Sequence, residues 1–363
     1  MKLLAEGACK FYAQPSGGEK GPVSRQGGAF YNPAMRHARD VTVALCRAAA
    51  KPGWTMLDGL ASSGVRGLRV ALEAAPIAEI VLNVYNPSIV QIIDKNIALN
   101  GAKNARSSRR NVNALLGEER FDYVDIDPFG TPVPYLTAAL QGVENKGMLG
   151  FCATDVGVLT GSFKKVCQRR YMARPVNNEC AHELALRILV GYAVRLAAAH
   201  DLAAEPLVCY SRGHYLRCYL MMTRGVKRAE AQMEQMAHAN FEPDGRRWIS
   251  KHPEAREHAG PLWVGPLFSK DILGAMSQRL SEHTQGIEKD LTLWEKEWGA
   301  APLFYDTNIM ARKFKASPPK LATLMEGLRS MGFNAQSTYF TPTGFKTDAQ
   351  PEDMRALFAR NPS

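Results

Sequence analysis

Residues 54–67, WTMLDGLASSGVRG, predict the first strand, turn and helix of an α/β fold. Trp54–Leu60 is a short apolar run of the kind that forms a buried parallel strand, and helical spacing covers Val65–Ala75. Small residues lie between these two segments, and they let the backbone turn sharply and approach a ligand closely. A plain strand-to-helix turn is the alternative interpretation of the same residues.

Alternating strand and helix patterns continue downstream of this stretch. The expected elements are, in chain order, Glu79–Tyr85, Pro87–Asn100, Phe121–Asp127, Pro132–Gln141, Gly147–Asp155 and Asn178–His200. A further strand is expected near Arg106–Arg110, where the apolar pattern is weak, and Leu207–Tyr210 and Tyr215–Met222 fit a closing hairpin. This alternation predicts a mostly parallel sheet with helices on both faces and an antiparallel strand at its edge.

The composition changes from about Val226, where charged and turn residues begin to dominate. Regular patterns then return as two helices and a strand, at Asp271–Trp298, Pro318–Met331 and Gln336–Phe340. We therefore predict two domains, residues 1–250 and a small α+β domain of residues 251–363. Within the first domain, Pro15–Gly28 is rich in Gly, Pro and Ser, which predicts a mobile loop.

The charge balance and the cysteine pattern narrow the class of protein. The formal net charge of +10 favours a polyanionic partner such as nucleic acid. The seven cysteines form no C-x-x-C pair, which argues against a disulfide framework and against a four-cysteine zinc site. No apolar run reaches about 18 residues, so we expect no membrane span, and we expect a cytoplasmic location.

Residues 122–130, DYVDIDPFG, carry the most specific chemical pattern in the chain. An apolar strand ends here in Asp127, and Pro128-Phe129-Gly130 follow. The exocyclic amine of a nucleobase is a poor nucleophile because its lone pair is delocalised into the ring, and an acceptor such as Asp127 orients it and receives its proton. Phe129 offers a stacking face for the base. An Asp-Pro turn that only caps the strand is the alternative.

The turn after the first strand suits a different ligand. Residues 57–67 do not read G-x-G-x-x-G, which disfavours a dinucleotide site. A strand that ends in Asp58, followed by a glycine-bearing turn, suits the charged amino-acid end of S-adenosylmethionine. Ligands of open parallel sheets bind beyond the carboxyl ends of the strands, so we expect Asp58 and Asp127 to lie at the same edge.

Several further motifs match one known family. They are Phe30-Tyr31-Asn32-Pro33, Arg39-Asp40, Leu57–Gly67, Asp125–Pro132, Ala153-Thr154-Asp155, Trp263–Leu267, Phe304-Tyr305-Asp306-Thr307 and Thr341-Pro342-Thr343-Gly344. With these motifs the sequence resembles the tRNA (guanine-26-N2)-dimethyltransferase family over nearly its whole length. The resemblance implies a Rossmann-like class I methyltransferase fold, S-adenosyl-L-methionine as cofactor and tRNA as partner. We expect a monomer without a metal ion.

The resemblance also implies a reaction and residue roles. One or two methyl groups are transferred to N2 of a guanine near the junction of the D-stem and anticodon stem, at position 26, giving N2-methyl- and N2,N2-dimethylguanosine. Asp127 accepts from the amine, and Phe30 and Phe129 hold the flipped base between them. The implied contacts of the cofactor are Arg39, Asp58 and Arg66.

The sequence departs from the family pattern at two cofactor positions. Val84 stands where the family has an acidic residue for the ribose hydroxyls, and Asn111-Val112-Asn113 stands where it has Asp-Ala-Asn near the adenine. Valine accepts no hydrogen bond, and the loss of a bidentate acceptor costs roughly 2–3 kcal/mol, about a hundredfold in affinity. Asn83 and Asn86 are candidates to replace the carboxylate in part.

Two basic segments are candidates for RNA contacts. They contain Arg312, Lys313 and Lys315 around one aromatic residue, and Lys164, Lys165 and Arg169 after the Gly147–Asp155 strand. Cations that neutralise phosphates release counterions, so such contacts are sensitive to salt. A solvated helix face is the alternative interpretation of each segment.

Three functional hypotheses follow from these patterns. The first is an active tRNA guanine-N2 methyltransferase. The second is a tRNA-binding relative whose cofactor binding is weakened or lost, because Val84 and Asn111 replace acidic family positions. The third is methylation of another amine, such as adenine N6 or a protein side chain, which the aromatic pair and the basic second domain disfavour.

Overall fold

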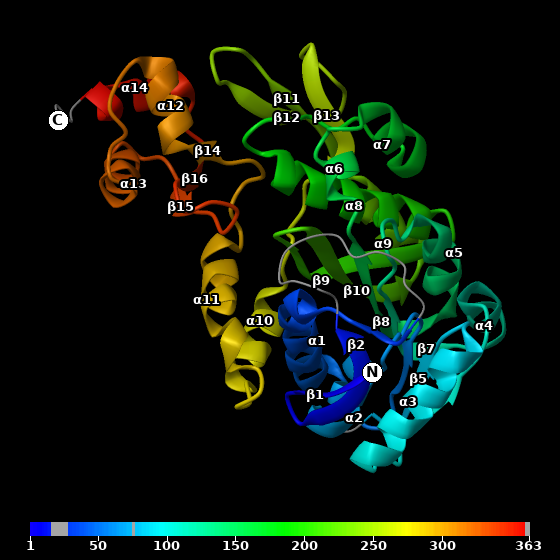
Figure 1. Ribbon diagram of the computed structural model, residues 1–363. Helices are drawn as coiled ribbons and strands as arrows, with labels where there is room; N and C mark the ends of the chain where they lie inside the picture. Colours follow the sequence, from blue (N-terminus) through cyan, green and yellow to red (C-terminus); the bar gives the residue numbers. More distant parts are fainter. Residues whose placement is uncertain (16–27, 75–76, 360–363) are drawn as a thin grey trace.

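A central sheet of seven strands organises the computed structural model, which describes residues 1–15, 28–74 and 77–359. The order is β6-β5-β4-β7-β8-β10-β9, and Figure 1 labels β5, β7, β8, β9 and β10 of this sheet. The strands are β4 (Thr55–Asp58), β5 (Glu79–Asn83), β6 (Ala105–Ser108), β7 (Phe121–Ile126), β8 (Val143–Ala153), β9 (Leu202–Arg212) and β10 (Tyr215–Arg224). The Pro15–Gly28 segment, for which a mobile loop was predicted, lies almost wholly outside the described residues.

The pairing of these strands confirms the mostly parallel sheet, including the weakly patterned strand, which is β6. The strands β6, β5, β4, β7 and β8 pair in parallel. The expected hairpin closes the sheet, but β10 lies one strand in from the edge, antiparallel to both β8 and β9. β9 forms the edge itself, because the tight turn at Gly213 folds the nearly fully buried β10 back between β9 and β8.

The helices around this sheet begin and end at residues with clear local preferences. They are α1 (Arg36–Ala49), α2 (Val65–Glu73), α3 (Pro87–Asn100), α4 (Val112–Glu118), α5 (Val133–Gly142), α6 (Val156–Leu159), α7 (Lys164–Tyr171) and α8 (Ala181–Ala198). In α3, the Asn86 side chain caps the first turn, Pro87 occupies the first position, and Gly101 ends the helix in a left-handed conformation. The bounds predicted for α3 are therefore correct to the residue.

An N-terminal sheet that the sequence patterns did not predict lies beside α3. It consists of β1 (Lys2–Glu6), β2 (Cys9–Pro15) and β3 (Phe30–Tyr31), in the order β1-β2-β3. The Asn96 side chain on α3 accepts from Tyr12 N at 2.6 Å and donates to Tyr12 O at 3.1 Å, which fixes β2 on the helix. A 3-10 helix, η1 (Pro33–Met35), leads from β3 into α1. This sheet brings Phe30 to the carboxyl edge of the central sheet.

Residues 226–260, where charged and turn residues dominate and no clean periodicity predicts an element, lie in a helix and a second antiparallel sheet that extends to Trp263. These elements are α9 (Val226–Met233), β11 (Met236–Phe241), β12 (Arg247–Ser250) and β13 (Glu257–Trp263). β13 packs against α8. The single helix expected over Asp271–Trp298 is instead α10 (Lys270–Gln278), η2 (Gln285–Ile287) and α11 (Glu288–Glu297). The break occurs because the buried Thr284 hydroxyl binds the backbone of Ser281 and closes a turn.

The remaining elements group apart from the central sheet (Figure 1). They are β14 (Tyr305–Asp306), α12 (Thr307–Phe314), α13 (Leu321–Ser330), β15 (Ala335–Ser337), β16 (Gly344–Thr347) and α14 (Pro351–Ala359), with the strand order β14-β16-β15. Among the described residues, a large buried apolar cluster extends from Cys9 to Phe304 and a small one from Tyr305 to Phe358. The division into residues 1–250 and 251–363 stays a prediction.

No helix in the described part of the chain has the length and apolar character needed to cross a membrane.

Candidate active site

The carboxyl ends of β4 and β7 lie side by side and carry the two motifs of interest. Asp58 pairs with Asp125 across the parallel strands, and Gly59 N donates to Asp125 O at 2.9 Å. A Cβ atom on Gly59 would lie 2.9 Å from the side chains of Ile126 and Val112, so the close approach of the two strand ends requires glycine. The fold thus brings Asp58 within one strand spacing of the Asp127 turn, as predicted.

Asp127 is the first residue after β7, and its carboxylate reaches the surface. The side chain is 22% exposed, so it is not sealed in the core. Arg66 Nη2 on α2 donates a hydrogen bond to it. Burial alone would raise the pKa of the Asp127 carboxyl, but the positive charges of Arg66 and Arg217 outweigh burial and hold that pKa below its usual range. Asp127 is therefore a charged acceptor at neutral pH.

A buried carboxylate beneath the site organises these two arginines. Asp125 is fully buried and receives hydrogen bonds from Arg217 and Tyr123, and its Oδ1 lies 3.4 Å from Arg66 Nε. Arg66 Nη1 also donates to Thr42 Oγ1 at 2.8 Å. Arg217 lies outside every sequence motif described above. Its position inside the apolar run YLRCYL was the available indication, because a buried arginine needs a carboxylate partner.

Asp58 is the carboxylate best placed for a cationic ligand. In the part of the chain that the structure describes, it accepts from Gly67 N alone, at 3.2 Å. Burial and the negative charge of Asp125 raise the pKa of the Asp58 carboxyl to about 7. A positively charged group beside Asp58 would compensate for both effects. The site therefore fits the ammonium group and the sulfonium of S-adenosyl-L-methionine.

The two aromatic residues predicted to hold a base lie against each other. The Phe30 and Phe129 ring centroids are 5.4 Å apart in an edge-to-face arrangement, and Phe129 is 56% exposed. Ser62, in the turn after β4, accepts from Phe30 N and donates to Phe30 O, both at 2.9 Å. Ser62 has a left-handed φ of 49°, a strained conformation for a residue with a side chain. The turn after β4 thus holds Phe30 directly.

The Ala153-Thr154-Asp155 motif anchors the turn that carries Phe129. Gly130 N donates to Thr154 Oγ1 and Thr154 N donates to Gly130 O, both at 2.8 Å. The Tyr171 hydroxyl lies 2.8 Å from Thr131 Oγ1 and donates to Asp155 Oδ1 at 2.8 Å. Because Tyr171 is the last residue of α7, these bonds also tie α7 to the Asp127 turn.

Arg39 lies in a buried ionic cluster beside Tyr31 and Asn32. Its Nε and Nη2 donate to the two carboxylate oxygens of Glu6 at 2.7 and 2.5 Å. Arg39 Nη2 also donates to Asn32 O at 3.0 Å, and Glu6 accepts from the Tyr31 hydroxyl at 2.8 Å. Arg39 therefore supports the Phe-Tyr-Asn-Pro segment in addition to the cofactor role that the resemblance implies.

The two positions that depart from the family pattern are Val84, which follows β5, and Asn111, which precedes α4. Val84 directly follows β5 and is half-buried. The Asn83 amide donates to Gly59 O and Arg110 O and accepts from Arg110 N, all at 3.1 Å. Asn83 is therefore held in place by backbone contacts with Gly59 and Arg110.

The remaining candidates have local structural roles as well. The exposed Asn86 side chain caps α3, and the exposed Asn111 side chain caps α4 by accepting from Asn113 N and Ala114 N. Val112 is buried against the glycine turn after β4. These contacts are compatible with cofactor binding near the first turns of α3 and α4.

The predicted RNA-binding residues are exposed and lie on separate helices. Lys164, Lys165 and Arg169 are on α7, Arg312 and Lys313 are on α12, and Lys315 ends α12. Lys313 Nζ donates to Pro243 O at 2.8 Å, which links α12 to the turn between β11 and β12. Within residues 1–15, 28–74 and 77–359, no group of three potential ligands could hold a metal ion.

Three features define a Rossmann-like class I methyltransferase. They are the strand order, the acidic end of β4 followed by a glycine turn, and the Asp-Pro-Phe-Gly turn after β7, the fourth strand of the central sheet in chain order. Residues 10–358 match the profile of a family described as N2,N2-dimethylguanosine tRNA methyltransferase. The chain belongs to the N2,N2-dimethylguanosine tRNA methyltransferase family, as the motifs indicated.

Individual relatives agree over nearly the full length. The tRNA (guanine(26)-N(2))-dimethyltransferase of Pyrococcus furiosus is 36% identical over 360 residues, covering 92% of this chain and 93% of that protein. The protein of the same name from Methanocaldococcus jannaschii is 35% identical over 363 residues, 96% of each chain. The structure of Trm1 from Pyrococcus horikoshii with S-adenosyl-L-methionine has a TM-score of 0.89 and 30% identity, covering 99% of this chain and 100% of that chain.

Proposed function

We propose that this protein transfers methyl groups from S-adenosyl-L-methionine to N2 of guanine 26 in tRNA, forming N2-methyl- and N2,N2-dimethylguanosine. The observation that carries the proposal is the Asp127 carboxylate, charged and accessible beside the Phe30–Phe129 pair. The names of the two relatives and the ligand of the Pyrococcus horikoshii structure support it. The comparisons give no support to the alternative hypothesis, in which this protein binds tRNA but its cofactor binding is weakened or lost.

The cofactor would supply a methyl group activated by its sulfonium charge. Asp58 is positioned to accept from the cationic amino-acid end, and Arg39, Val84, Asn111 and Val112 are proposed to border the rest of the pocket. Small residues in the turn after β4 let the backbone turn sharply and approach a ligand closely at that edge. In-line transfer depends mainly on this positioning, because the reacting atoms must approach closely and with the correct orientation.

Asp127 holds and deprotonates the guanine amine in this proposal. Its carboxylate accepts one N–H of the amine, and Pro128 O is the candidate acceptor for the other. Arg66 keeps Asp127 ionised, so the acceptor remains available down to acidic pH. A newly methylated, positively charged guanine amine is strongly acidic, so even a carboxylate of lowered pKa receives its proton.

Phe30 and Phe129 are proposed to enclose the flipped guanine. A stacked base lies roughly 3.5–4 Å from each ring, so the two rings must separate to roughly 7 Å from the observed edge-to-face pair. The exposed Phe129 side chain is free to make this movement, whereas Ser62 holds the Phe30 backbone. The cations of α7 and α12 are proposed to bind the tRNA backbone on either side of the site.

The direct test is mass spectrometry of nucleosides from unmodified tRNA incubated with the protein and S-adenosyl-L-methionine. We expect N2-methylguanosine followed by N2,N2-dimethylguanosine, and loss of both products when guanine 26 is replaced by adenine. Asp127→Ala should abolish transfer with little change in tRNA affinity, whereas Asp201→Ala, an exposed carboxylate outside the site, should be fully active. Transfer by the Asp127→Ala variant would remove Asp127 from the mechanism.

A further inference from the structure

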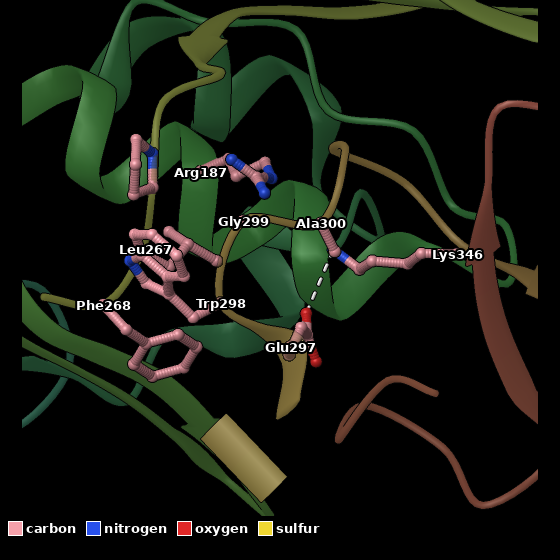
Figure 2. A pocket seen from close by; sticks show the side chains of 9 residues that line it. Arg187, Leu267, Phe268, Glu297, Trp298, Gly299, Ala300 and Lys346 are labelled. Carbon is pink, nitrogen blue, oxygen red and sulfur yellow. Dashed lines mark ion pairs between the residues drawn. The ribbon is translucent and has the colours of Figure 1, made fainter. Parts of the chain in front are cut away.

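Lys346 is a buried lysine at the boundary between the two apolar clusters. It lies on β16 and is 3% exposed. Its Nζ is 2.7 Å from Glu183 Oε1 on α8 and 3.0 Å from Glu297 Oε1 on α11. Figure 2 shows the Lys346 side chain extending from its strand toward Glu297, with the ion pair dashed. One side chain of the C-terminal elements thus binds carboxylates on two elements of the larger cluster.

The first of these carboxylates is held rigidly by the larger cluster. Glu183 Oε1 accepts from Arg187 Nε at 2.9 Å and from Leu303 N at 3.1 Å. The cations Lys346 and Arg187 hold the pKa of Glu183 below its usual range, although burial alone would raise it. Arg187 Nη1 in turn donates to Trp263 O at 3.1 Å and to Gly265 O at 3.0 Å. The Trp263–Leu267 motif is therefore part of this junction.

The second carboxylate is bound from the C-terminal side as well. Glu297 Oε2 accepts from Thr338 Oγ1 at 2.9 Å and from Tyr339 N at 2.8 Å. Directly beyond these residues, Asp306 accepts from Thr343 Oγ1 at 2.5 Å, and Thr307 N donates to Thr343 O at 3.0 Å. The last two sequence motifs, residues 304–307 and 341–344, thus border the same junction.

The junction is ionic and contains no room for a substrate. Lys346, Arg187, Glu183 and Glu297 balance two positive against two negative charges, and all four are buried. The cavity beside them measures about 20 Å³, the space of about one water molecule (Figure 2). The cluster therefore fixes how the elements meet. Buried ion pairs with directional hydrogen bonds favour one arrangement of the surfaces that they join, because a shift would leave a buried charge unpaired.

The arrangement that this junction fixes includes the basic helix α12. β16 pairs with β14, and β14 runs directly into α12, which carries Arg312 and Lys313. The catalytic residue Asp127 directly follows Ile126 of the larger cluster, and the apolar residues of α8, the helix that carries Glu183, belong to the same cluster. A shift of β16 relative to α8 would therefore change the distance between the α12 cations and Asp127.

We infer that Lys346 is a positioning residue for tRNA: it orients the C-terminal elements so that a tRNA bound by α12 presents its target base at Asp127. The inference rests on the proposed function. It extends that function by assigning the Trp263–Leu267, Phe304–Thr307 and Thr341–Gly344 motifs to the orientation of the substrate.

The test separates positioning from stability by comparing two variants. Lys346→Met leaves an excess negative charge in the junction, whereas Lys346→Met with Glu297→Gln is charge-balanced but has no ion pair between β16 and α11. We expect the single variant to melt at a lower temperature and the double variant to recover most of that loss. Both variants should have a KM for tRNA at least tenfold above wild type, with kcat within threefold and the affinity for S-adenosyl-L-methionine unchanged. Lys289→Met, which removes an exposed lysine of α11, is the matched control and should behave as wild type.

A KM for tRNA that returns to the wild-type value in the double variant would overturn the inference, because the junction would then contribute stability alone. Wild-type protein that methylates no tRNA would refute the proposed function instead. In that event, small-angle scattering of the same variants measures the orientation of the C-terminal elements. An unchanged scattering curve for both variants would overturn the inference independently of activity.

Discussion

Arg66 on α2 donates a hydrogen bond to Asp127 at the end of β7, and the same guanidinium lies 3.4 Å from the buried Asp125. Arg66 therefore connects the exposed carboxylate of the site to a carboxylate that is fully buried beneath it. Arg217 completes the group by binding Asp125. The charge state and the orientation of Asp127 depend on an arginine that the resemblance associates with the cofactor.

Replacing Arg66 should move the pH dependence of methyl transfer. The positive charge of Arg66 lowers the pKa of Asp127, so Arg66→Met should raise that pKa and leave Asp127 protonated at a higher pH. The acidic limb of kcat/KM should then shift to higher pH. At the plateau, loss of a hydrogen bond between charged groups, about 1.5–3 kcal/mol, should lower the rate roughly 10- to 150-fold. The Arg66→Lys variant keeps the positive charge, so its acidic limb of kcat/KM should lie at the wild-type pH. An acidic limb that does not shift in Arg66→Met would show that Arg66 does not lower the pKa of Asp127.

Cofactor binding should depend on pH through Asp58. Burial and Asp125 raise the pKa of Asp58 to about 7, so the neutral form predominates below that pH. Only the carboxylate pairs with a cation, so affinity for S-adenosyl-L-methionine should increase as the pH rises through about 7. The expected change is roughly tenfold between pH 6 and pH 8, as linkage requires for one titrating group. Calorimetric titration across this range measures it. The Asp58→Asn variant should bind S-adenosyl-L-methionine weakly and with the same affinity at every pH in this range. If its affinity rises with pH as in the wild type, Asp58 is not the titrating group.

The ribose position offers a gain-of-affinity experiment. Val84 is half-buried directly after β5, and the neighbouring Asn83 amide is already bonded to Gly59 and Arg110. Val84→Asp should therefore add an acceptor that the wild-type pocket lacks, with up to roughly a hundredfold gain in affinity for S-adenosyl-L-methionine. Val84→Asn is the matched variant without the charge and should gain less. Equal affinity in the wild type and Val84→Asp would show that the ribose does not lie at this position.

Much of this architecture could be predicted from sequence because its determinants are local. The bounds of α3 follow from Asn86, Pro87 and Gly101, whose preferences act within one turn. The Asp127 turn is equally local, since a strand, a carboxylate and a proline occur in direct succession. Asp58 and Asp127 could be placed at one edge because parallel strands end at the same side of a sheet.

The rest depends on contacts between residues far apart in the sequence. β11 and β13 show no clear alternation, because adjacent residues on both faces of these strands are buried and their pairing is irregular between Ala237 and Ala239. The pairs Arg217–Asp125 and Lys346–Glu183 join residues 92 and 163 positions apart. No periodicity encodes such pairs. A lone charge within an apolar strand indicates that a partner exists without identifying it.

The aromatic pair should affect catalysis through stacking. Phe129→Ala removes one face of the proposed base enclosure, and stacking of a base on an aromatic side chain is worth about 1–3 kcal/mol. We expect kcat/KM for tRNA to fall roughly 5- to 150-fold, with unchanged affinity for S-adenosyl-L-methionine. Phe129→Trp should retain most of the activity and Phe129→Leu should not, because leucine offers bulk without a π face. Full activity in Phe129→Leu would indicate that bulk alone suffices.

The two basic segments should contribute separately to tRNA affinity. Lys164 and Lys165 begin α7, which Tyr171 ties to the Asp127 turn, whereas Arg312 and Lys315 belong to α12 and its end. If each cation neutralises one phosphate, each double replacement by alanine should lower the slope of log K against log salt by roughly 1.4–1.8. The reductions should add when both pairs are replaced, because α7 and α12 bury their apolar residues in different clusters. Lys289 and Lys296, exposed on α11, provide a control of equal charge loss. A slope in the α7 or α12 variant equal to that of the control would show that the segment is a solvated face and does not bind RNA.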